Sequence, residues 1–257
     1  MTLPLYTPSV AVITGATSGF GRETALRLAK LGTKLILTGR RTERLQDLQN
    51  QIDTPVHILT QDLCDTAQVA SDFANLPDAF QDVDLVINNA GLALGVNALQ
   101  DKDVADSLTM VDTNIKGLLA VTHALLPGMV ARKKGHIINV GSTAGTFSYT
   151  GGNTYCGTKA FVNHFSGTLR ADLKGKNVRV SCIEPGNIET EFSDVRFKGD
   201  KDKADTVYAG YRKMVGSEIA DMIVWLATQP EHINVTHLEV MPTDQAPNGL
   251  NCTGIDT

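Results

Sequence analysis

The sequence has no excess of basic residues, and this absence excludes one class of partner. Lys and Arg together number 23 against 28 Asp and Glu, which gives a formal net charge of -5 at pH 7. Proteins that bind nucleic acids usually present a basic face to the phosphate backbone. We therefore expect no nucleic-acid partner.

Cysteine is also scarce, and its spacing does not match that of a metal site. Cys64, Cys156, Cys182 and Cys252 include no pair of the CxxC type. This distribution fits neither a zinc site nor the disulfide framework of a small secreted protein. We expect no bound metal and a reducing, cytoplasmic location.

Long apolar runs are missing as well. Residues 1–8 lack the pattern of a signal peptide, and no segment approaches the roughly 18 uncharged apolar residues of a spanning helix. We therefore predict a protein that is neither secreted nor membrane-spanning. With 42% hydrophobic and 20% charged residues over 257 positions, the composition is that of a globular chain with one packed core.

Short apolar runs typical of strands alternate with longer amphipathic segments. The expected strands are 10–14, 34–38, 56–59, 85–87, 136–140, 178–183 and 237–240, and the expected helices are 21–31, 43–51, 67–74, 104–132, 154–173 and 217–228. Such alternation implies parallel pairing through right-handed crossovers. We predict an α/β fold with one Rossmann-like, doubly wound parallel sheet of about seven strands and helices on both faces.

No linker or internal repeat divides the chain, so we expect a single domain over residues 1–257. Two segments lack the alternation, and long connections of this kind are usually functional. We interpret the first, about 186–212, as a lid, and the second, about 241–257, as a closing or assembly segment. Helices 104–132 and 154–173 are apolar enough to form subunit contacts, although the same stripe could face the sheet.

A glycine-rich turn, Thr14-Gly-Ala-Thr-Ser-Gly-Phe-Gly21, follows the first expected strand and opens into a helix. Gly15 permits the tight turn, Gly19 lets a pyrophosphate approach the backbone, and Gly21 lets the helix pack against the sheet. Its position between a first strand and a first helix predicts a dinucleotide site. The expected contacts in this turn are Gly15, Thr17, Ser18, Gly19, Phe20 and Gly21.

The second expected strand ends without the acidic residue that binds the adenosine ribose of NAD. Arg40 and Arg41 occupy that place. A guanidinium bonded to a ribose 2′-phosphate is worth about 1.5–3 kcal/mol, or roughly ten- to a hundredfold in favour of NADP. We therefore predict NADP(H) as the cofactor. In the alternative interpretation, the two arginines form a solvated helix start that faces Glu43.

Small and amide residues follow the third and fourth expected strands, at the sheet edge where open α/β folds bind ligands. The cofactor contacts expected there are Asp62, Leu63, Asn89, Ala90 and Gly91. Structural alternatives exist for two positions. Asp62 could cap the helix that begins near Thr66, and Asn88 could hold a turn.

Ser142, Tyr155 and Lys159 form the densest group of reactive side chains. Tyr155 and Lys159 lie four apart in an expected helix and share one face, and Ser142 follows a strand that ends at the same sheet edge. A tyrosine pKa must fall from about 10 to about 7 for proton exchange near neutral pH, which takes about 4 kcal/mol. A lysine about 4 Å away supplies on the order of 4 kcal/mol at an effective dielectric near 20, and a helix end only about 0.3–1 kcal/mol. We expect Lys159 to lower the pKa of Tyr155.

The ordered motifs resemble those of the short-chain dehydrogenases/reductases over nearly the whole chain. They are the glycine-rich turn, Asn88-Asn-Ala-Gly91, Asn114, Ser142, Tyr155-x-x-x-Lys159 and Pro185-Gly186 with Thr190. The resemblance implies that Tyr155 is the general acid/base and that Ser142 orients the carbonyl. It implies that Lys159 binds the nicotinamide ribose and that Asn114 holds a proton-relay water against it.

The same resemblance places Pro185, Gly186, Ile188 and Thr190 around the nicotinamide. Cys156 varies from the pattern, and we interpret it as a buried small residue rather than a nucleophile, because its neighbour Tyr155 points elsewhere on the helix.

Within the family, segments 89–95, 126–130, 135–139, 141–145 and 192–200 are similar to the NADP-dependent 3-hydroxy acid dehydrogenases of bacteria and yeast. This resemblance implies hydride transfer between NADP(H) and a small anionic 3-hydroxy acid or its semialdehyde, with serine, allo-threonine and 3-hydroxypropionate as the substrate class, in a homotetramer. The alternatives are a sulfoacetaldehyde reductase, a broad-range carbonyl reductase, and a non-catalytic NADP-sensing protein of the same fold.

The expected lid carries Arg196 and Lys198. A guanidinium can hold a carboxylate or sulfonate through two hydrogen bonds. We predict that Arg196 binds the substrate anion and that Tyr149 donates a further hydrogen bond. The alternative is a surface cation that faces Asp194 or Asp200.

Overall fold

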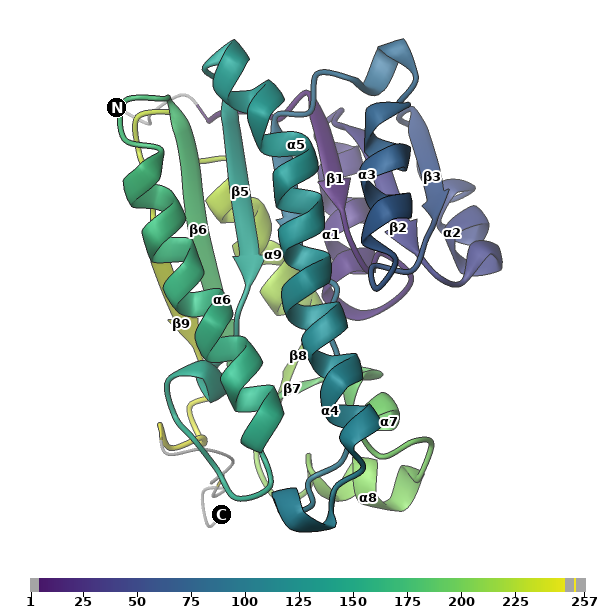
Figure 1. The fold of residues 1–257 in the computed structure, drawn as a ribbon, viewed down its shortest axis with the longest axis vertical. Helices are drawn as coiled ribbons and strands as arrows, with labels where there is room; N and C mark the ends of the chain where they lie inside the picture. The colour runs from purple at the N-terminus through teal and green to yellow at the C-terminus, as the bar shows by residue number, and fades with distance from the viewer. Residues whose placement is uncertain (1–4, 248–251, 253–257) are drawn as a thin grey trace.

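A parallel sheet of seven strands forms the centre of the molecule, in the order β3-β2-β1-β4-β5-β6-β9 (Figure 1). The computed structural model describes residues 5–247 and Cys252. The strands are β1 Val10–Ile13, β2 Lys34–Gly39, β3 Val56–Thr60, β4 Leu85–Asn88, β5 Gly135–Val140, β6 Val178–Pro185 and β9 His237–Val240. Each expected strand is confirmed, with bounds that differ by at most two residues. The architecture is a single Rossmann-like α/β domain.

Helices cover both faces of this sheet. They are α1 Gly19–Lys30, α2 Thr42–Gln49, α3 Thr66–Ala74, α4 Val104–Val111, α5 Leu118–Arg132, α6 Asn153–Asp172 and α9 Gly216–Ala227. In Figure 1, α3, α5 and α6 lie in front of the strands, while α1 and α9 lie behind them. Short 3-10 turns occur at Asp78–Phe80, Leu99–Asp101 and Thr143–Gly145. The helix expected at 104–132 is interrupted by a π turn at Asp112–Gly117, which joins α4 to α5.

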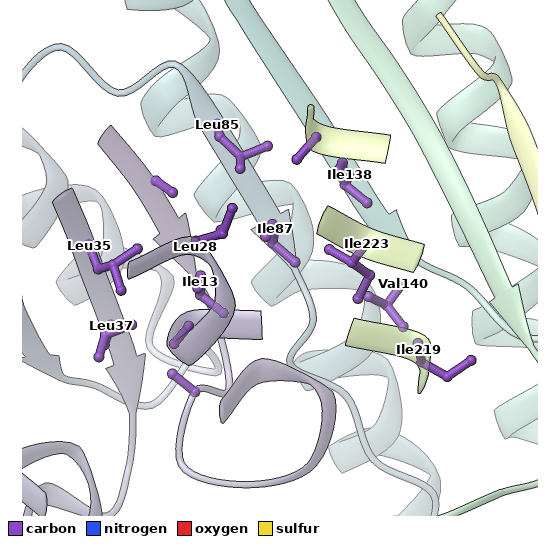
Figure 2. Packing of buried hydrophobic residues seen from close by; sticks show 14 of the residues in the cluster. Ile13, Leu28, Leu35, Leu37, Leu85, Ile87, Ile138, Val140, Ile219 and Ile223 are labelled. Carbon is purple, nitrogen blue, oxygen red and sulfur yellow. The ribbon is translucent and has the colours of Figure 1, made fainter. Parts of the chain in front are cut away.

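Strand β1, at the centre of the sheet, shows why a central strand can be apolar at every position. Successive side chains point to opposite faces of a sheet. Val10 and Val12 enter the core beneath α3 and α5, while Ala11 and Ile13 enter the core beneath α1 and α9. Figure 2 shows the second core, in which Ile13 and other strand residues pack against helix residues such as Leu28, Ile219 and Ile223. Both faces of β1 are therefore buried, as a sheet covered on two sides requires at its centre.

The run from Val104 to Arg132 departs from one expectation of the sequence analysis. It is the one helical run among the described residues that is long and apolar enough to cross a membrane, judged by length and composition alone. Core helices of globular proteins meet the same criterion. Here α5 packs against α3 and strands β4 and β5, and α4 packs against α6. Its apolar character is thus partly explained by packing within the domain.

The segment expected to be an irregular lid contains short regular elements. It includes β7 Ile188–Glu189, α7 Phe192–Arg196 and α8 Lys201–Thr206, and β7 pairs with β8 Met214–Val215. Helices this short are not stable by themselves, so they leave no readable periodicity and depend on tertiary contacts. They lie beyond the carboxyl ends of the central strands (Figure 1). The expected closing segment, 241–257, falls only partly within the described residues.

Candidate active site

A cavity of about 360 Å³ lies at the carboxyl ends of the strands and gathers most of the predicted site residues. Those that line it are Gly15, Thr17, Ser18, Gly19, Phe20, Arg40, Arg41, Asp62, Leu63, Asn89, Ala90, Gly91, Ser142, Tyr149, Tyr155, Lys159, Pro185, Gly186, Ile188, Thr190 and Arg196. Two predicted residues, Gly21 and Asn114, do not line the cavity. The cavity therefore brings together the glycine-rich turn, which is expected to bind the pyrophosphate, and the Ser142–Tyr155–Lys159 group. We call the part around this second group the chemical end.

The glycine-rich turn forms one wall of the cavity, and its shape depends on two close approaches. Gly15 has a φ of +66°, and a Cβ there would lie 2.9 Å from the Cα of Ala90. A Cβ on Gly21 would lie 2.6 Å from Nδ2 of Asn89. Both positions therefore require glycine, Gly21 for packing rather than for direct ligand contact.

Helix α1 begins at the edge of this turn with an open N-terminus. Its N-cap residue, Ser18, makes no side-chain cap, and no acidic residue lies in the first turn. The first N–H groups of a helix lack intrahelical acceptors and attract anions. The turn thus fits the pyrophosphate of a dinucleotide.

Asn89 supports the turn, whereas its neighbour Asn88 is buried and does not line the cavity. Asn89 donates from Nδ2 to the carbonyl oxygen of Thr14 at 2.9 Å. Asn88 donates to Oδ1 of Asn139 at 2.9 Å and to Oγ1 of Thr122 at 3.1 Å, inside the core. The structural alternative for Asn88 is correct in that the residue is structural, although it joins two strands and a helix rather than holding a turn.

The alternative role of Asp62 as a helix cap is wrong. Asp65 caps α3, with its carboxylate accepting from the backbone N–H of Gln68. Asp62 instead accepts from the N–H of Cys64 at 3.0 Å and lines the cavity. It is therefore placed to contact a ligand, as the cofactor prediction requires.

Arginines gather at the end of the cavity where the adenosine of a dinucleotide is expected, which we call the adenosine end. Arg41 donates from Nη2 to Oγ1 of Thr17 at 2.7 Å and to Oγ of Ser18 at 3.0 Å, so its guanidinium is fastened to the glycine-rich turn. It also pairs with Glu191 at 3.2 Å, and not with the expected Glu43. Arg40 is more exposed, with Nη1 3.9 Å from Oδ2 of Asp62.

A third arginine at this end was not predicted from the sequence. Arg44 pairs with the same Glu191 at 2.8 Å. Arg41 and Arg44 are three residues apart, and Arg44 lies in α2, so both can reach one carboxylate. That spacing is the signal that would have identified it.

Tyr155 and Ser142 meet at the other end of the cavity, and both are buried at 8% exposure. Strand β5 ends two residues before Ser142, and Tyr155 lies in the first turn of α6. Burial raises the pKa of Tyr155 above its ordinary value, while the Arg196 guanidinium and a hydrogen bond with Ser142 lower it. At neutral pH the phenol is therefore protonated.

Arg196, rather than the expected Lys159, is the first charged group that lowers the pKa of Tyr155 in this structure. The ammonium of Lys159 lies 6.0 Å from the centroid of the Tyr155 ring and donates to the carbonyl oxygen of Val140 at 2.7 Å. Burial lowers the pKa of Lys159 itself to about 8. The Lys159 ammonium is thus directed at the backbone carbonyl, and its role in lowering the pKa of Tyr155 stays a prediction.

Asn114 is buried at 2% exposure within the π turn, and its amide is engaged by protein groups. Nδ2 donates to the carbonyl oxygen of Leu92 at 2.9 Å and to Oγ1 of Thr158 at 3.0 Å. A Cβ on Gly91 would lie 3.3 Å from Oδ1 of Asn114 and 3.5 Å from Nζ of Lys159, so the glycine separates the two side chains. The water-holding role expected of Asn114 stays a prediction.

Arg196 is the most unusual charge in the site. It is 5% exposed, and its guanidinium lies 5.2 Å from the ring of Tyr155 and donates to Oη of Tyr149 at 3.0 Å. Its Nε atom has no hydrogen-bond partner. Among the described residues, neither Asp194 nor Asp200 forms an ion pair with it, and Asp200 pairs with Lys203. Within residues 5–247, no acidic side chain neutralises this buried cation, which is costly unless a ligand does so.

Several cavity residues were not predicted. They include Gln61, Thr143, Phe147, Asn187, Glu191, Phe192, Tyr208 and Gln245. Gln245, from the segment after β9, accepts from the backbone N–H of Asn187 at 2.7 Å. Such contacts join distant parts of the chain, so no local pattern in the sequence marks them. Cys156 is buried at 8% exposure, as predicted.

Potential metal ligands also meet outside the cavity, where Glu184, His237 and Glu239 lie close together on β6 and β9. The carboxylate of Glu184 is fully buried and is already bonded to Nε2 of His237 at 3.1 Å and to Oγ1 of Thr146 at 3.3 Å. This group is thus explained by protein contacts.

The Rossmann-like sheet, the glycine-rich turn and the Ser142–Tyr155–Lys159 group agree with a family assignment. The chain belongs to the short-chain dehydrogenase family, whose sequence model matches residues 9–201.

Individual members of this family are similar to the chain over almost its whole length. The chain is 46% identical over 243 residues to the NADP-dependent 3-hydroxy acid dehydrogenase YdfG of Shigella flexneri, which covers 94% of this chain and 98% of the relative. It is 49% identical over 239 residues to serine 3-dehydrogenase of Rhizobium radiobacter, with 93% and 96% covered. A solved closed form of serine dehydrogenase complexed with NADP+ superposes with a TM-score of 0.91 at 46% identity, with 94% and 98% covered.

Proposed function

We propose that this chain is an NADP(H)-dependent oxidoreductase that interconverts a small anionic 3-hydroxy acid and its semialdehyde. The named relatives support the cofactor and the substrate class, because the likeness extends over almost the whole chain. One observation of the structure carries the proposal furthest. Arg196 is a buried guanidinium without a carboxylate partner among the described residues, and it lies beside Tyr155.

The residues around the cavity fit NADP(H). The open N-terminus of α1 and the glycine-rich turn would hold the pyrophosphate, while Arg40 and Arg41 would face the 2′-phosphate. The same cavity is lined by the predicted contacts Leu63, Ala90, Pro185 and Ile188. These residues would flank the rings of the cofactor. When bound, the cofactor supplies or accepts the hydride at the substrate carbon.

Tyr155 would exchange the proton at the substrate oxygen. Because burial raises its pKa, the phenol is protonated at neutral pH and is ready to donate to a carbonyl in the direction of reduction. Ser142 lies beside it and would orient that oxygen. In the direction of oxidation, the positive charge of Arg196 favours the phenolate. Lys159 would hold the ribose of the nicotinamide.

Arg196 would bind the acid group of the substrate. Its Nε is unpartnered, and its Nη2 contacts Tyr149, so a carboxylate could accept from both residues. A sulfonate offers the same pattern of acceptors, which keeps sulfoacetaldehyde as the second candidate substrate. A broad-range carbonyl reductase would not need a buried cation. A non-catalytic NADP-sensing protein would not need Ser142, Tyr155 and Lys159 together.

We further propose a cytoplasmic homotetramer in which segment 186–212 closes over the cavity. Helix α4 supports the assembly, because Val104 and Leu108 are 69% and 57% exposed although both are large and apolar. Exposed apolar patches of this type mark interaction surfaces. Glu191, Phe192 and Arg196 support the lid, because they line the cavity from that segment. The mass in solution, measured by light scattering, tests the assembly.

The function is tested by steady-state kinetics with serine, 3-hydroxypropionate, malonic semialdehyde and sulfoacetaldehyde, each with NADP(H) and NAD(H). We expect Arg196→Ala to raise the KM of an anionic substrate roughly 10- to 100-fold, because a charged hydrogen bond is worth about 1.5–3 kcal/mol. A neutral short aldehyde should be little affected. An unchanged KM for every anionic substrate would exclude Arg196 as the anion site, and no turnover with any of them would refute the proposed substrate class.

A further inference from the structure

Glu191 lies on the first part of the lid segment and pairs with Arg41 and Arg44 at the start of α2. Its Oε2 is 3.2 Å from Nη1 of Arg41, and both of its carboxylate oxygens accept from Nη1 of Arg44, at 3.0 and 2.8 Å. Glu191 and Arg41 line the cavity. A single carboxylate therefore neutralises two guanidiniums at the end where the adenosine would lie.

The carboxylate of Glu191 is charged at neutral pH. Burial opposes ionisation, but hydrogen bonds from Arg44 and Arg41 hold the pKa of Glu191 below its ordinary value. The pairs are half exposed, at 43% to 48% for the side chains involved. Such exposed pairs are weak, so a stronger anion can displace them.

The guanidinium of Arg41 has little spare capacity for a second anion. Nε and Nη2 already donate to Thr17, and Nη2 also donates to Ser18. The remaining nitrogen, Nη1, is the one that donates to Glu191. A ribose phosphate that binds Nη1 must share this nitrogen with the Glu191 carboxylate, and two anions on one guanidinium repel each other.

We propose that Glu191 is a specificity-determining residue that competes with the 2′-phosphate of NADP(H) for Arg41 and Arg44. This inference rests on the proposed function, since it takes a ligand with a phosphate on the adenosine ribose as the competitor. A cofactor that lacks this phosphate leaves the Glu191 pairs intact. Glu191 thus limits how tightly the phosphorylated cofactor is held, and it sets the ratio of the two affinities.

Binding of NADP+ and NAD+ to Glu191→Gln, measured by isothermal titration calorimetry, tests the proposal without turnover. We expect the affinity for NADP+ to rise roughly three- to tenfold, because two exposed ion pairs no longer oppose the phosphate, and the affinity for NAD+ to change less than about twofold. Glu189→Gln is the matched control, because Glu189 is two residues away and pairs with Lys213 outside the cavity. It should leave both affinities unchanged.

The outcomes separate the two ideas. If the wild type prefers NADP+ but Glu191→Gln binds it equally or more weakly, Glu191 braces the arginines, and the competition is refuted while the proposed function stands. If the wild type shows no preference for NADP+, the proposed cofactor fails, and the inference fails with it. Thermal melting checks that each variant is folded, and Glu191→Ala repeats the test with a shorter side chain.

Discussion

The two ends of the cavity hold cations in opposite ways. At the adenosine end, Arg40, Arg41 and Arg44 are 63%, 43% and 46% exposed in their side chains, and each lies within 4.0 Å of a carboxylate. At the chemical end, Lys159 and Arg196 are each 5% exposed, and among the described residues neither forms an ion pair.

This difference indicates how each end treats its ligand. Exposed ion pairs contribute little to stability but hold side chains in position. Buried cations without a counterion carry a desolvation cost that a ligand anion can offset. The adenosine end is therefore organised by the protein before binding, whereas the chemical end is electrostatically incomplete without its substrate.

The largest effect that we predict is at the chemical end. Tyr155→Phe removes the proton donor but keeps the ring, so kcat/KM should fall about 100- to 10,000-fold while the affinity for NADPH changes little. Loss of NADPH absorbance with a semialdehyde measures the first quantity, and fluorescence titration measures the second. Equal turnover in the variant would refute the acid/base role.

Burial of Lys159 predicts a pH-dependent stability. Its pKa is lowered from 10.5 to about 8 in the folded chain, so between these values the unfolded chain binds more protons, and a rise in pH favours folding. Lys159→Met should therefore gain about 3 kcal/mol over the wild type at pH 7, and this gain should disappear by about pH 10.5. Urea unfolding from pH 7 to 10.5 measures it, with Lys176→Met as an exposed control. Parallel curves for wild type and Lys159→Met would contradict the prediction.

The adenosine end should show a smaller effect that depends on the ligand. Arg40→Ala combined with Arg41→Ala should reduce the preference for NADPH over NADH, which lacks the 2′-phosphate, by roughly ten- to a hundredfold. The ratio of kcat/KM for the two cofactors measures it. Arg22→Ala is the control, since Arg22 pairs with Glu23 outside the cavity. An unchanged ratio would show that these arginines do not bind the 2′-phosphate.

The smallest effect is expected at Lys198, the second cation of the lid. Its Nζ pairs with Asp106 at 2.9 Å, and the side chain is 61% exposed. Lys198→Met should change the KM of an anionic substrate less than about twofold, because Lys198 does not line the cavity and its charge is exposed to solvent and already paired. A change as large as that of Arg196→Ala would mean that burial does not distinguish the two lid cations.

The sheet and its ligand edge could be predicted because each strand carries its own local signal. Strand β1 is apolar at every position and is followed by a glycine-rich turn, and these features identify both its burial and its function. The partners of Arg41 and Arg196 could not be predicted. Arg41 meets Glu191 across 150 residues of chain, and such a pair depends on how the lid folds back.

The pKa of Tyr155 shows a second limit of sequence reasoning. The spacing of Tyr155 and Lys159 correctly indicates one helix face, but it does not show that the Lys159 ammonium turns toward Val140. Nor does it show that Arg196 approaches the ring from the lid. The direction of a pKa shift depends on burial and on such distant groups, which only the folded chain defines.

The π turn at Asp112–Gly117 has a consequence for insertions and deletions in this region. Each residue of an α-helix rotates the side-chain direction by about 100° around the helix axis. The number of residues in the π turn therefore sets which way the side chains of α4 point relative to those of α5. Loss of one residue there would leave α5 packed on the sheet but would turn the exposed side chains of α4, such as Leu108, toward a different direction. Changes in length at this point would therefore also act through the buried Met110 of α4, which shares a cluster with Tyr155, and so would reach the cavity while the sheet stays intact.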